Sequence, residues 1–230
     1  MFSARPQLSI APAAIVSWKK VSQGDPLAVS LDDVKTFVNR PIEDTFWDAE
    51  YTTFIKVAVA EIERVARIDL TAKTWVGTLP QFYDRIALNK RPFVTVDRLQ
   101  YVAAATGEIL DVDATIYQAL PMHQLCGMLF LGDGLRWPNT ALRMDAVRIT
   151  VKSGFAVTKT DEAAGYPDLP DEIKHALLMT IAAMDNKRGD DTGGVRATTV
   201  YAMKNARGGS LIPPEAKSLI ADYVYRWVTA

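Results

Sequence analysis

The stretch Glu43–Leu70, EDTFWDAEYTTFIKVAVAEIERVARIDL, decides the fold of this chain. Its apolar residues recur every three or four positions without glycine or proline, which predicts one long amphipathic helix. Acidic residues in the first turn (Glu43, Asp44) and basic residues in the last (Arg64, Arg67) suit the helix dipole. The apolar stripe consists of Trp47, Tyr51, Phe54, Ile55, Ala58, Ile62, Val65 and Ala66. Because a helix of this length cannot bury such a stripe alone, other elements must pack on it.

Length and composition are those of a globular protein. The chain has 230 residues, enough for one domain or a domain with a sizeable insertion. Its 26 basic and 27 acidic side chains give a net charge of -1, without the basic excess of a general nucleic-acid binder. The single cysteine, Cys126, excludes an internal disulfide and a multi-cysteine metal site. The longest uncharged run, 114–132, is too polar and broken to span a bilayer, so we expect a soluble protein without membrane contact.

The N-terminal part predicts an arm followed by a helical hairpin. Residues 1–27 are rich in Pro, Ala and Ser and lack both a sustained period and the pattern of a signal peptide, which indicates an arm. Within residues 28–72, Ser30 is a natural N-cap for a short helix that ends before Pro41. The long helix follows almost at once, so the two helices form a hairpin.

Residues 73–157 predict a β-rich insertion. The strand candidates within it are residues 74–82, 85–88, 93–102, 108–112, 116–120, 128–131 and 146–151. The segment Gly132-Asp133-Gly134 is typical of a hairpin turn, in which glycine supplies a positive φ. These features indicate a small antiparallel module that lies between helices.

Helix returns in residues 168–188, where Pro170 is expected at the first helical position. Residues 189–211 are glycine-rich and charged, which predicts a flexible loop, and residues 212–230 predict a C-terminal helix and tail. The buried faces of these two helices are expected to contain Ile173, Leu177, Ile181, Met184, Ala216, Leu219, Tyr223 and Trp227. The predicted fold class is therefore α+β, a helical bundle of about four helices with an inserted small antiparallel β-module.

The histidines, the cysteine and the paired carboxylates do not predict a catalytic or metal site. His123 and Cys126 lie three residues apart, but two ligands do not make a zinc site. His175 is offset from the buried stripe of its helix, which indicates a surface or interface position. Four carboxylate pairs are interpreted as helix N-terminal charge, a solvated helix face, the end of a turn and a loop: Asp32/Asp33, Glu61/Glu63, Asp111/Asp113 and Asp190/Asp191. We therefore expect no enzymatic activity and no cofactor.

Glycine-rich and basic segments do not predict a phosphate or nucleic-acid site. Residues 189–194 and 206–210 lack the Gly-Lys-Ser/Thr ending of a phosphate-binding loop and do not lie between a strand and a helix. The short basic clusters at 19–20, 89–91 and 204–207 lack interleaved aromatic residues on which bases stack. Ordinary surface charge is the preferred interpretation for each cluster.

The C-terminus is unusual in its aromatic content. Tyr223, Tyr225, Arg226 and Trp227 crowd the last eight residues, behind the glycine-rich segment. Aromatic residues and arginine are enriched among the buried anchors of interfaces. Docking on the chain's own helices is the alternative for Tyr223 and Trp227, whereas Tyr225 and Arg226 point elsewhere on the helix. We interpret this segment as an assembly element.

Seven segments carry a resemblance in their order along the chain: PLAVSLDDVKTFVNR, IERVARIDLTAKTW, RIALNKRPFVTVDRLQYV, LRWP, AVRITVKSGF, LPDEIKHALLMTIAAMDNKR and IPPEAKSLIADYVYRWV. This ordered set, over about residues 26–228, resembles the head–tail connector (adaptor, head-completion) proteins of tailed bacteriophages and gene transfer agents. Each motif alone is a packing or turn pattern, so the order is what is specific. The chain departs from the family in its longer arm, residues 1–23, and in the uncharged segment 117–131.

The resemblance implies a non-enzymatic virion protein of the neck, assembled in the cytoplasm of the bacterial host. Such adaptors form a dodecameric ring on the portal protein, extend the DNA ejection channel and offer a platform to the next neck, stopper or tail protein. It also implies a portal interface at Tyr223, Tyr225, Arg226 and Trp227. The near-zero net charge suits a channel wall along which double-stranded DNA slides. The alternatives are a stopper or tail terminator, or a small hydrolase or nuclease that uses His123 or the aspartate pairs.

A ring would also give the polar face of the long helix a function. A closed ring uses heterologous contacts, in which each copy presents one side to its neighbour. Asp48, Lys56, Glu63 and Arg67 make a face of mixed charge that suits such a contact. We therefore predict that these four residues form the inter-subunit interface, while the apolar stripe packs on the helix at 168–188.

Overall fold

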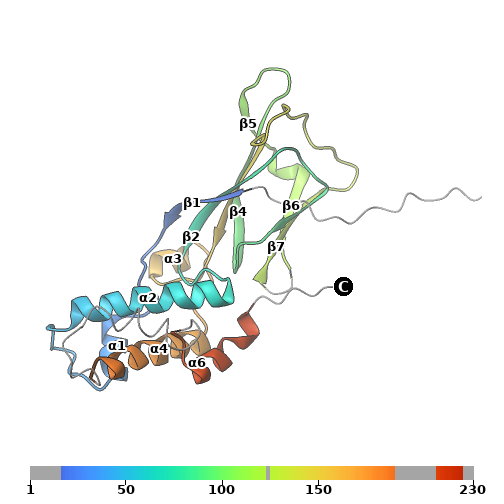
Figure 1. Ribbon diagram of the computed structural model, residues 1–230. Helices are drawn as coiled ribbons and strands as arrows, with labels where there is room; N and C mark the ends of the chain where they lie inside the picture. The colour runs from blue at the N-terminus through green and yellow to red at the C-terminus, as the bar shows by residue number, and fades with distance from the viewer. Residues whose placement is uncertain (1–16, 123–124, 190–210, 225–230) are drawn as a thin grey trace, which may run out of the picture.

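The computed structural model describes residues 17–122, 125–189 and 211–224, which form a helical layer with a β part rising from one side (Figure 1). The helical layer contains α1 (Leu31–Phe37), α2 (Asp48–Ala66), α4 (Asp171–Gly189), α6 (Pro214–Leu219) and the short 3-10 helix η3 (Ala221–Tyr223). The apolar residues of these helices share one core. The predicted α+β class is confirmed.

Helix α2 packs on α4 as its apolar stripe predicts. Tyr51, Ile55 and Ile62 are fully buried in the same core as Ile173 and Leu177 of α4. The helix begins at Asp48, later than predicted, because residues 41–47 form turns instead; Asp44 caps one of them by accepting a hydrogen bond from the backbone of Phe46. The first turn is therefore acidic through Asp48 and Glu50.

The ends of α1 and α4 are capped near the predicted residues, whereas the C-terminal helix differs from the prediction. Ser30 caps α1, since its Oγ accepts a hydrogen bond of 3.1 Å from the backbone of Asp33. Pro170 lies one residue before α4, and its carbonyl oxygen accepts the first helical hydrogen bonds. The predicted continuous C-terminal helix is wrong within the described residues, because α6 ends at Leu219 and η3 follows after Ile220.

The β part consists of two antiparallel sheets. The five-stranded sheet has the order β1 (Ser17–Gln23), β2 (Lys73–Leu79), β8 (Val147–Ser153), β4 (Phe93–Val102) and β5 (Ile109–Asp111). The three-stranded sheet has the order β3 (Arg85–Leu88), β7 (Gly127–Leu131) and β6 (Tyr117–Pro121). Apolar side chains of both sheets share a second core. The β part is therefore more extensive than the predicted small module.

Two features of the β part differ from the prediction. Residues 17–23 fall in the predicted arm but form strand β1, because Trp18 packs on the second core and its ring occupies the space above Gly77 of β2. Gly134 has a positive φ, as predicted, with a value of 74°. The predicted hairpin turn at 132–134 is nevertheless wrong. Strands β7 and β8 on either side of it belong to different sheets.

Two short helices complete the described part of the chain. The 3-10 helix η1 (Ala114–Ile116) precedes β6, and α3 (Lys159–Ala163) follows β8 with a capping box between Thr158 and Asp161. None of the described helices combines the length and the apolar character needed to cross a membrane.

Candidate functional site

The helical layer meets the five-stranded sheet at a buried carboxylate, that of Asp69, in the loop between α2 and β2. Its Oδ2 accepts hydrogen bonds from Trp75 Nε1 (2.9 Å) and from Ser153 Oγ (2.5 Å). Its backbone N–H donates to the carbonyl oxygen of Arg91 (2.6 Å), in the turn between β3 and β4. The side chain of Asp69 thus ties the end of α2 to β2 and β8, and its backbone ties it to the β3–β4 turn.

A second carboxylate, Glu63 of α2, extends this junction. Lys73 Nζ donates to both Glu63 oxygens, at 2.7 and 2.6 Å, and lies 3.2 Å from Asp69 Oδ1. The Lys73 side chain is 5% exposed, so its ammonium group depends on these two carboxylates instead of water. The Glu63 carboxylate also accepts a hydrogen bond from the backbone of Leu70. The network therefore holds the direction in which the chain leaves α2.

The predicted solvated face at Glu61/Glu63 is consequently wrong. Glu61 is buried and pairs with Arg64, whose Nη2 lies 2.7 Å from the carboxylate. Hydrogen bonding and attraction from Glu61 raise the pKa of Arg64. Both acidic side chains serve the fold of their own chain, so neither is free to act as an acid or base.

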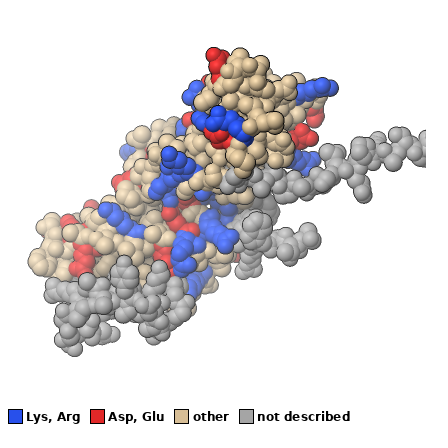
Figure 2. Space-filling model, turned by 45° about the horizontal axis from the view of Figure 1, so that its top comes forward, with Lys and Arg blue, Asp and Glu red and all other residues tan. Residues whose placement is uncertain are grey.

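A hollow of about 440 Å³ opens beside this junction, and we call it the basic groove. It is lined by Lys20, Ala60, Glu63, Arg64, Arg67, Ile68, Asp69, Lys73, Trp75, Asn89, Lys90 and Arg91. Six of these side chains are basic and two are acidic. Figure 2 shows charged side chains gathered where the helical layer meets the β part. The lining of the groove is thus predominantly basic.

The interpretation of residues 89–91 as ordinary surface charge is wrong. Lys90 Nζ lies 3.3 Å from the ring centroid of Trp75 and 5.6 Å from that of Trp18, so the ammonium group stacks on aromatic faces. Burial and repulsion from Lys73 lower the pKa of Lys90, against attraction from Asp69. Arg91 is buried and donates from Nη2 to the carbonyl oxygen of Tyr223 (3.2 Å). The aromatic partners come from β1 and β2, which is why the local sequence gave no sign of them.

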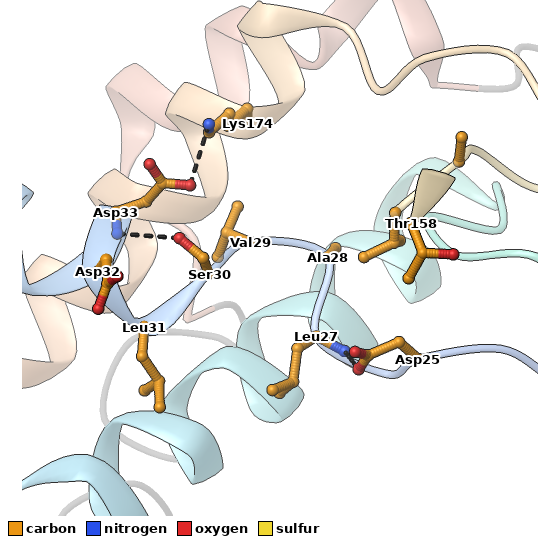
Figure 3. A pocket seen from close by; sticks show the side chains of 12 residues that line it. Asp25, Leu27, Ala28, Val29, Ser30, Leu31, Asp32, Asp33, Thr158 and Lys174 are labelled. Carbon is orange, nitrogen blue, oxygen red and sulfur yellow. Dashed lines mark hydrogen bonds and ion pairs between the residues drawn. The ribbon is translucent and has the colours of Figure 1, made fainter. Parts of the chain in front are cut away.

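A second hollow, of about 560 Å³, lies between the β1–α1 linker, α1, the segment after β8 and α4, and we call it the acidic hollow. Figure 3 shows Asp33 Oδ2 paired with Lys174 Nζ, at 3.0 Å, and Asp25 turned toward the backbone of Leu27. Burial raises the pKa of Asp33, but hydrogen bonds from Lys174 and Ser30 outweigh it and lower the pKa overall. As predicted, Asp32 and Asp33 lie in the first turn of α1. Asp25 and Asp32 are exposed.

The other residues considered for catalysis or metal binding do not line either of the two hollows. His175 is exposed, as expected, and its ring packs edge-on against Phe37 with centroids 5.5 Å apart. Cys126 is half-buried, and burial raises the pKa of its thiol, which disfavours the nucleophilic thiolate. The paired aspartates at 111 and 113 serve other purposes, since one pairs with Arg98 and the other caps η1.

No site for chemistry emerges from these positions. His123, Asp190 and Asp191 lie outside the described residues. Among the residues that are described, no group of three or more His, Cys, Asp and Glu side chains is arranged to hold a metal ion.

The predicted inter-subunit residues do not share one exposed face. Lys56 and Arg67 are exposed on α2. Asp48 instead pairs with the buried Lys35, at 2.6 Å, and Glu63 belongs to the junction described above. Two of the four side chains are thus used within their own chain, and only Arg67 borders the basic groove through an exposed position.

Of the predicted portal residues, the structure describes one. Tyr223 is half-buried against the helical core, and burial together with the negative charge of Glu172 raises its pKa. Tyr225, Arg226 and Trp227 lie outside the described residues. Because Arg91 bonds the carbonyl of Tyr223, the described chain ends beside the β3–β4 turn.

Three solved structures have chains similar to this one. A chain in the neck of an empty gene transfer agent (GTA) particle, with C6 symmetry, matches at a TM-score of 0.65 and 17% identity. A chain in the virion of a native GTA particle matches at 0.62 and 18%, and one in the neck of a native GTA particle, with C12 symmetry, at 0.61 and 19%. Each match covers 93% of this chain and 98% of the other. No family model and no curated protein sequence matches the chain. At these identities the likeness shows a shared fold.

Proposed function

We propose that this chain is a structural protein of a phage-like virion neck, a head–tail connector (adaptor) that forms a ring under the portal. The observation that carries the proposal is the fold, which is shared over nearly the full length of both chains with components of GTA necks. The ordered sequence segments that resemble adaptors support it independently of the fold. The scattered, structurally engaged carboxylates also fit a protein without enzymatic activity or cofactor.

The ring is proposed to be a dodecamer. The similar chains belong to necks with C12 and C6 symmetry, and both symmetries are compatible with twelve copies. Such a ring would extend the DNA channel of the portal and offer its other end to a stopper or tail protein. The net charge of -1 suits this role, because a strongly basic wall would hold the passing DNA.

We further propose that the C-terminal segment provides the portal contact. Tyr223 packs on the helical core and is tied to Arg91, so it anchors the segment to the rest of the chain. Tyr225, Arg226 and Trp227 would then supply the aromatic and guanidinium groups that enter the portal. Lys56 and Arg67 remain proposed contacts between neighbouring copies.

The purified full-length chain mixed with the portal protein of the same particle tests this function. We expect a twelvefold ring on the portal in electron micrographs. A triple variant, Y225A/R226A/W227A, should lose portal binding while keeping the far-ultraviolet circular dichroism of the wild type, because it leaves Tyr223 in place. Lys217→Ala, on exposed α6, is the matched control and should bind. Absence of any ring or portal complex with the full-length chain would refute the adaptor role, and co-purification with a different neck protein would indicate a stopper or tail terminator.

A further inference from the structure

We propose that the basic groove is one half of the contact between adjacent copies and receives the acidic rim of the next copy's acidic hollow. We define the acidic rim as Asp25, Asp32 and Asp33. This inference rests on the proposed ring and names the surfaces that would join its copies. Neither surface belongs to the proposed portal contact.

Three cations of the groove are available for an external partner. Among the described residues, Lys20, Arg67 and Lys90 have no carboxylate partner: Lys20 bonds the Gln23 side chain and Lys90 stacks on tryptophan. By contrast, Arg64 and Lys73, which also line the groove, are paired within the chain. Positive charge therefore remains at Lys20, Arg67 and Lys90, while Arg64 and Lys73 are neutralised within the chain.

The charge of the whole chain identifies a second copy as a suitable partner. The groove lining carries a surplus of four positive charges, whereas the entire chain carries a net charge of -1. The remainder of the chain therefore carries a net charge of -5. Outside its own groove a second copy therefore offers more acidic than basic side chains, and complementary charge steers such contacts and fixes their register.

The acidic rim is the part of that remainder that best complements the groove. Asp25 and Asp32 are exposed and, within the described structure, have no ion-pair partner, while Asp33 shares its charge with Lys174. The three carboxylates lie along one short segment that borders a hollow (Figure 3). The charge of this segment complements that of the basic groove.

The positions of the two surfaces agree with a ring. The groove is bordered by the outward face of α2, at Ala60, Arg64 and Arg67. The acidic rim lies on the end of the β1–α1 linker and the first turn of α1, where Leu27 and Leu31 pack against the helical core that α2 also faces. A contact between different surfaces is heterologous, and such a contact forms a ring when the rotation between neighbouring copies closes.

DNA is the other polyanion that a basic surface can bind, and the groove suits it less well. The surplus of positive charge is confined to one hollow of about 440 Å³, whereas affinity for a duplex grows with the number of phosphates neutralised along its length. A duplex would touch only the rim of such a hollow. A single acidic side chain, such as that of Asp32, needs far less room.

Charge reversal tests the proposal in the full-length chain. Arg67→Glu and Asp32→Arg should each weaken association by about tenfold or more per contact, because like charges then face each other. The double variant D32R/R67E should recover the rings, since each copy supplies both surfaces. Arg85→Glu, at an exposed position of β3 outside both surfaces, is the control with the same change of charge as Arg67→Glu. Rings are counted by native mass spectrometry and electron microscopy, with and without portal protein, and circular dichroism verifies folding.

Cross-linking provides a second measurement that does not depend on charge. In a Cys126→Ser background, cysteines at positions 32 and 67 of one chain should give a ladder of covalent multimers with a short bis-maleimide. Cysteines at positions 32 and 85 should not.

Rings of R67E that equal those of the wild type, or the absence of a ladder from assembled rings, would overturn the proposal and leave the adaptor role intact. If R67E assembles normally but loses binding to a short DNA duplex, the groove is a nucleic-acid site instead. If the wild type forms no ring even with portal, the proposed function fails together with this inference.

Discussion

Ser153 donates a hydrogen bond from Oγ to the carboxylate of Asp69, although 84 residues separate the two in sequence. Both residues are buried, at 0% exposure for Ser153 and 8% for Asp69. The bond joins β8, the middle strand of the five-stranded sheet, to the loop that follows α2. Since the same carboxylate also holds Trp75 and faces Lys73, the orientation of the sheet relative to the helical layer depends on one acidic residue.

Replacing this residue should therefore weaken the whole fold. Asp69→Ala leaves the buried Lys73 with one carboxylate instead of two and removes the acceptor of Trp75 and Ser153, so we expect a loss of about 3–5 kcal/mol in the free energy of unfolding. Urea denaturation followed by circular dichroism measures it. Asp97→Ala removes a half-exposed carboxylate that pairs with Lys152, and should cost about 0–1 kcal/mol. Equal losses in the two variants would show that the junction is not a structural centre.

Two residues predicted to lie together at the subunit interface should behave differently. Asp48 pairs with Lys35, whose side chain is 4% exposed. Asp48→Ala leaves this buried ammonium group bonded to the Ile42 carbonyl but without its carboxylate, and should lower the free energy of unfolding by about 3 kcal/mol or more. Lys56 is exposed on the same helix, and Lys56→Ala should change stability by about 0.5 kcal/mol or less. Thermal denaturation of both variants decides the matter. A stable Asp48→Ala variant that fails to form rings would return Asp48 to the interface.

The sequence predicts those parts of this fold that periodicity alone controls. Strand β4 has the bounds expected from the alternation between Phe93 and Val102, and Tyr51 and Ile62 are buried as the spacing in α2 requires. Periodicity says which face of an element is polar, but not what that face meets. Glu63 lies on the polar side of α2 and meets Lys73, a contact created by the turn of the chain after the helix.

The basic groove likewise depends on contacts that no local sequence pattern predicts. Lys90 has no aromatic neighbour along the chain, and its stacking on Trp75 and Trp18 exists only because β1 pairs with β2. The strand β1 itself escaped prediction, since its core contact, Trp18, is a single residue in a polar segment. Sites assembled from three separate elements leave no local pattern in any one of them.

Gly154 is expected to tolerate no side chain. Its φ is +113°, and a Cβ there would lie 2.0 Å from the carbonyl oxygen of Thr71, so the close approach of two backbone segments requires glycine. Gly154→Ala should cost about 3 kcal/mol or more or reduce the soluble yield, because the backbone must move. Gly107→Ala is the control: its φ of +71° carries strain, but nothing lies within 4 Å, so a cost of about 1–2 kcal/mol is expected. Urea midpoints of the two variants provide the comparison.

Asp145 should make stability depend on acid pH. Hydrogen bonds from Arg143 and Arg148 lower the pKa of Asp145 from 3.8 to about 2. A carboxyl group whose pKa is lower in the folded state stabilises the fold above the unfolded value of 3.8, and this contribution disappears as pH falls through about 2. Asp145→Asn should therefore have a lower urea midpoint than the wild type at pH 5, and the difference should close near pH 2. A difference that persists unchanged at pH 2 would contradict this assignment.

Lys90 is expected to matter more for association than for folding. The attraction between its ammonium group and the Trp75 ring opposes the cost of burial and the repulsion from Lys73, and the lowered pKa shows that the charge is less favourable here than in water. Lys90→Met keeps the aliphatic stem against the ring and removes the charge, so the free energy of unfolding should change by about 0.5 kcal/mol or less. Ring formation should weaken, since the basic groove loses one of its unpaired cations. Lys90→Arg, which retains the charge, should form rings as the wild type does. A Lys90→Met variant that assembles normally but loses more than about 1 kcal/mol of stability would show that Lys90 serves the fold alone.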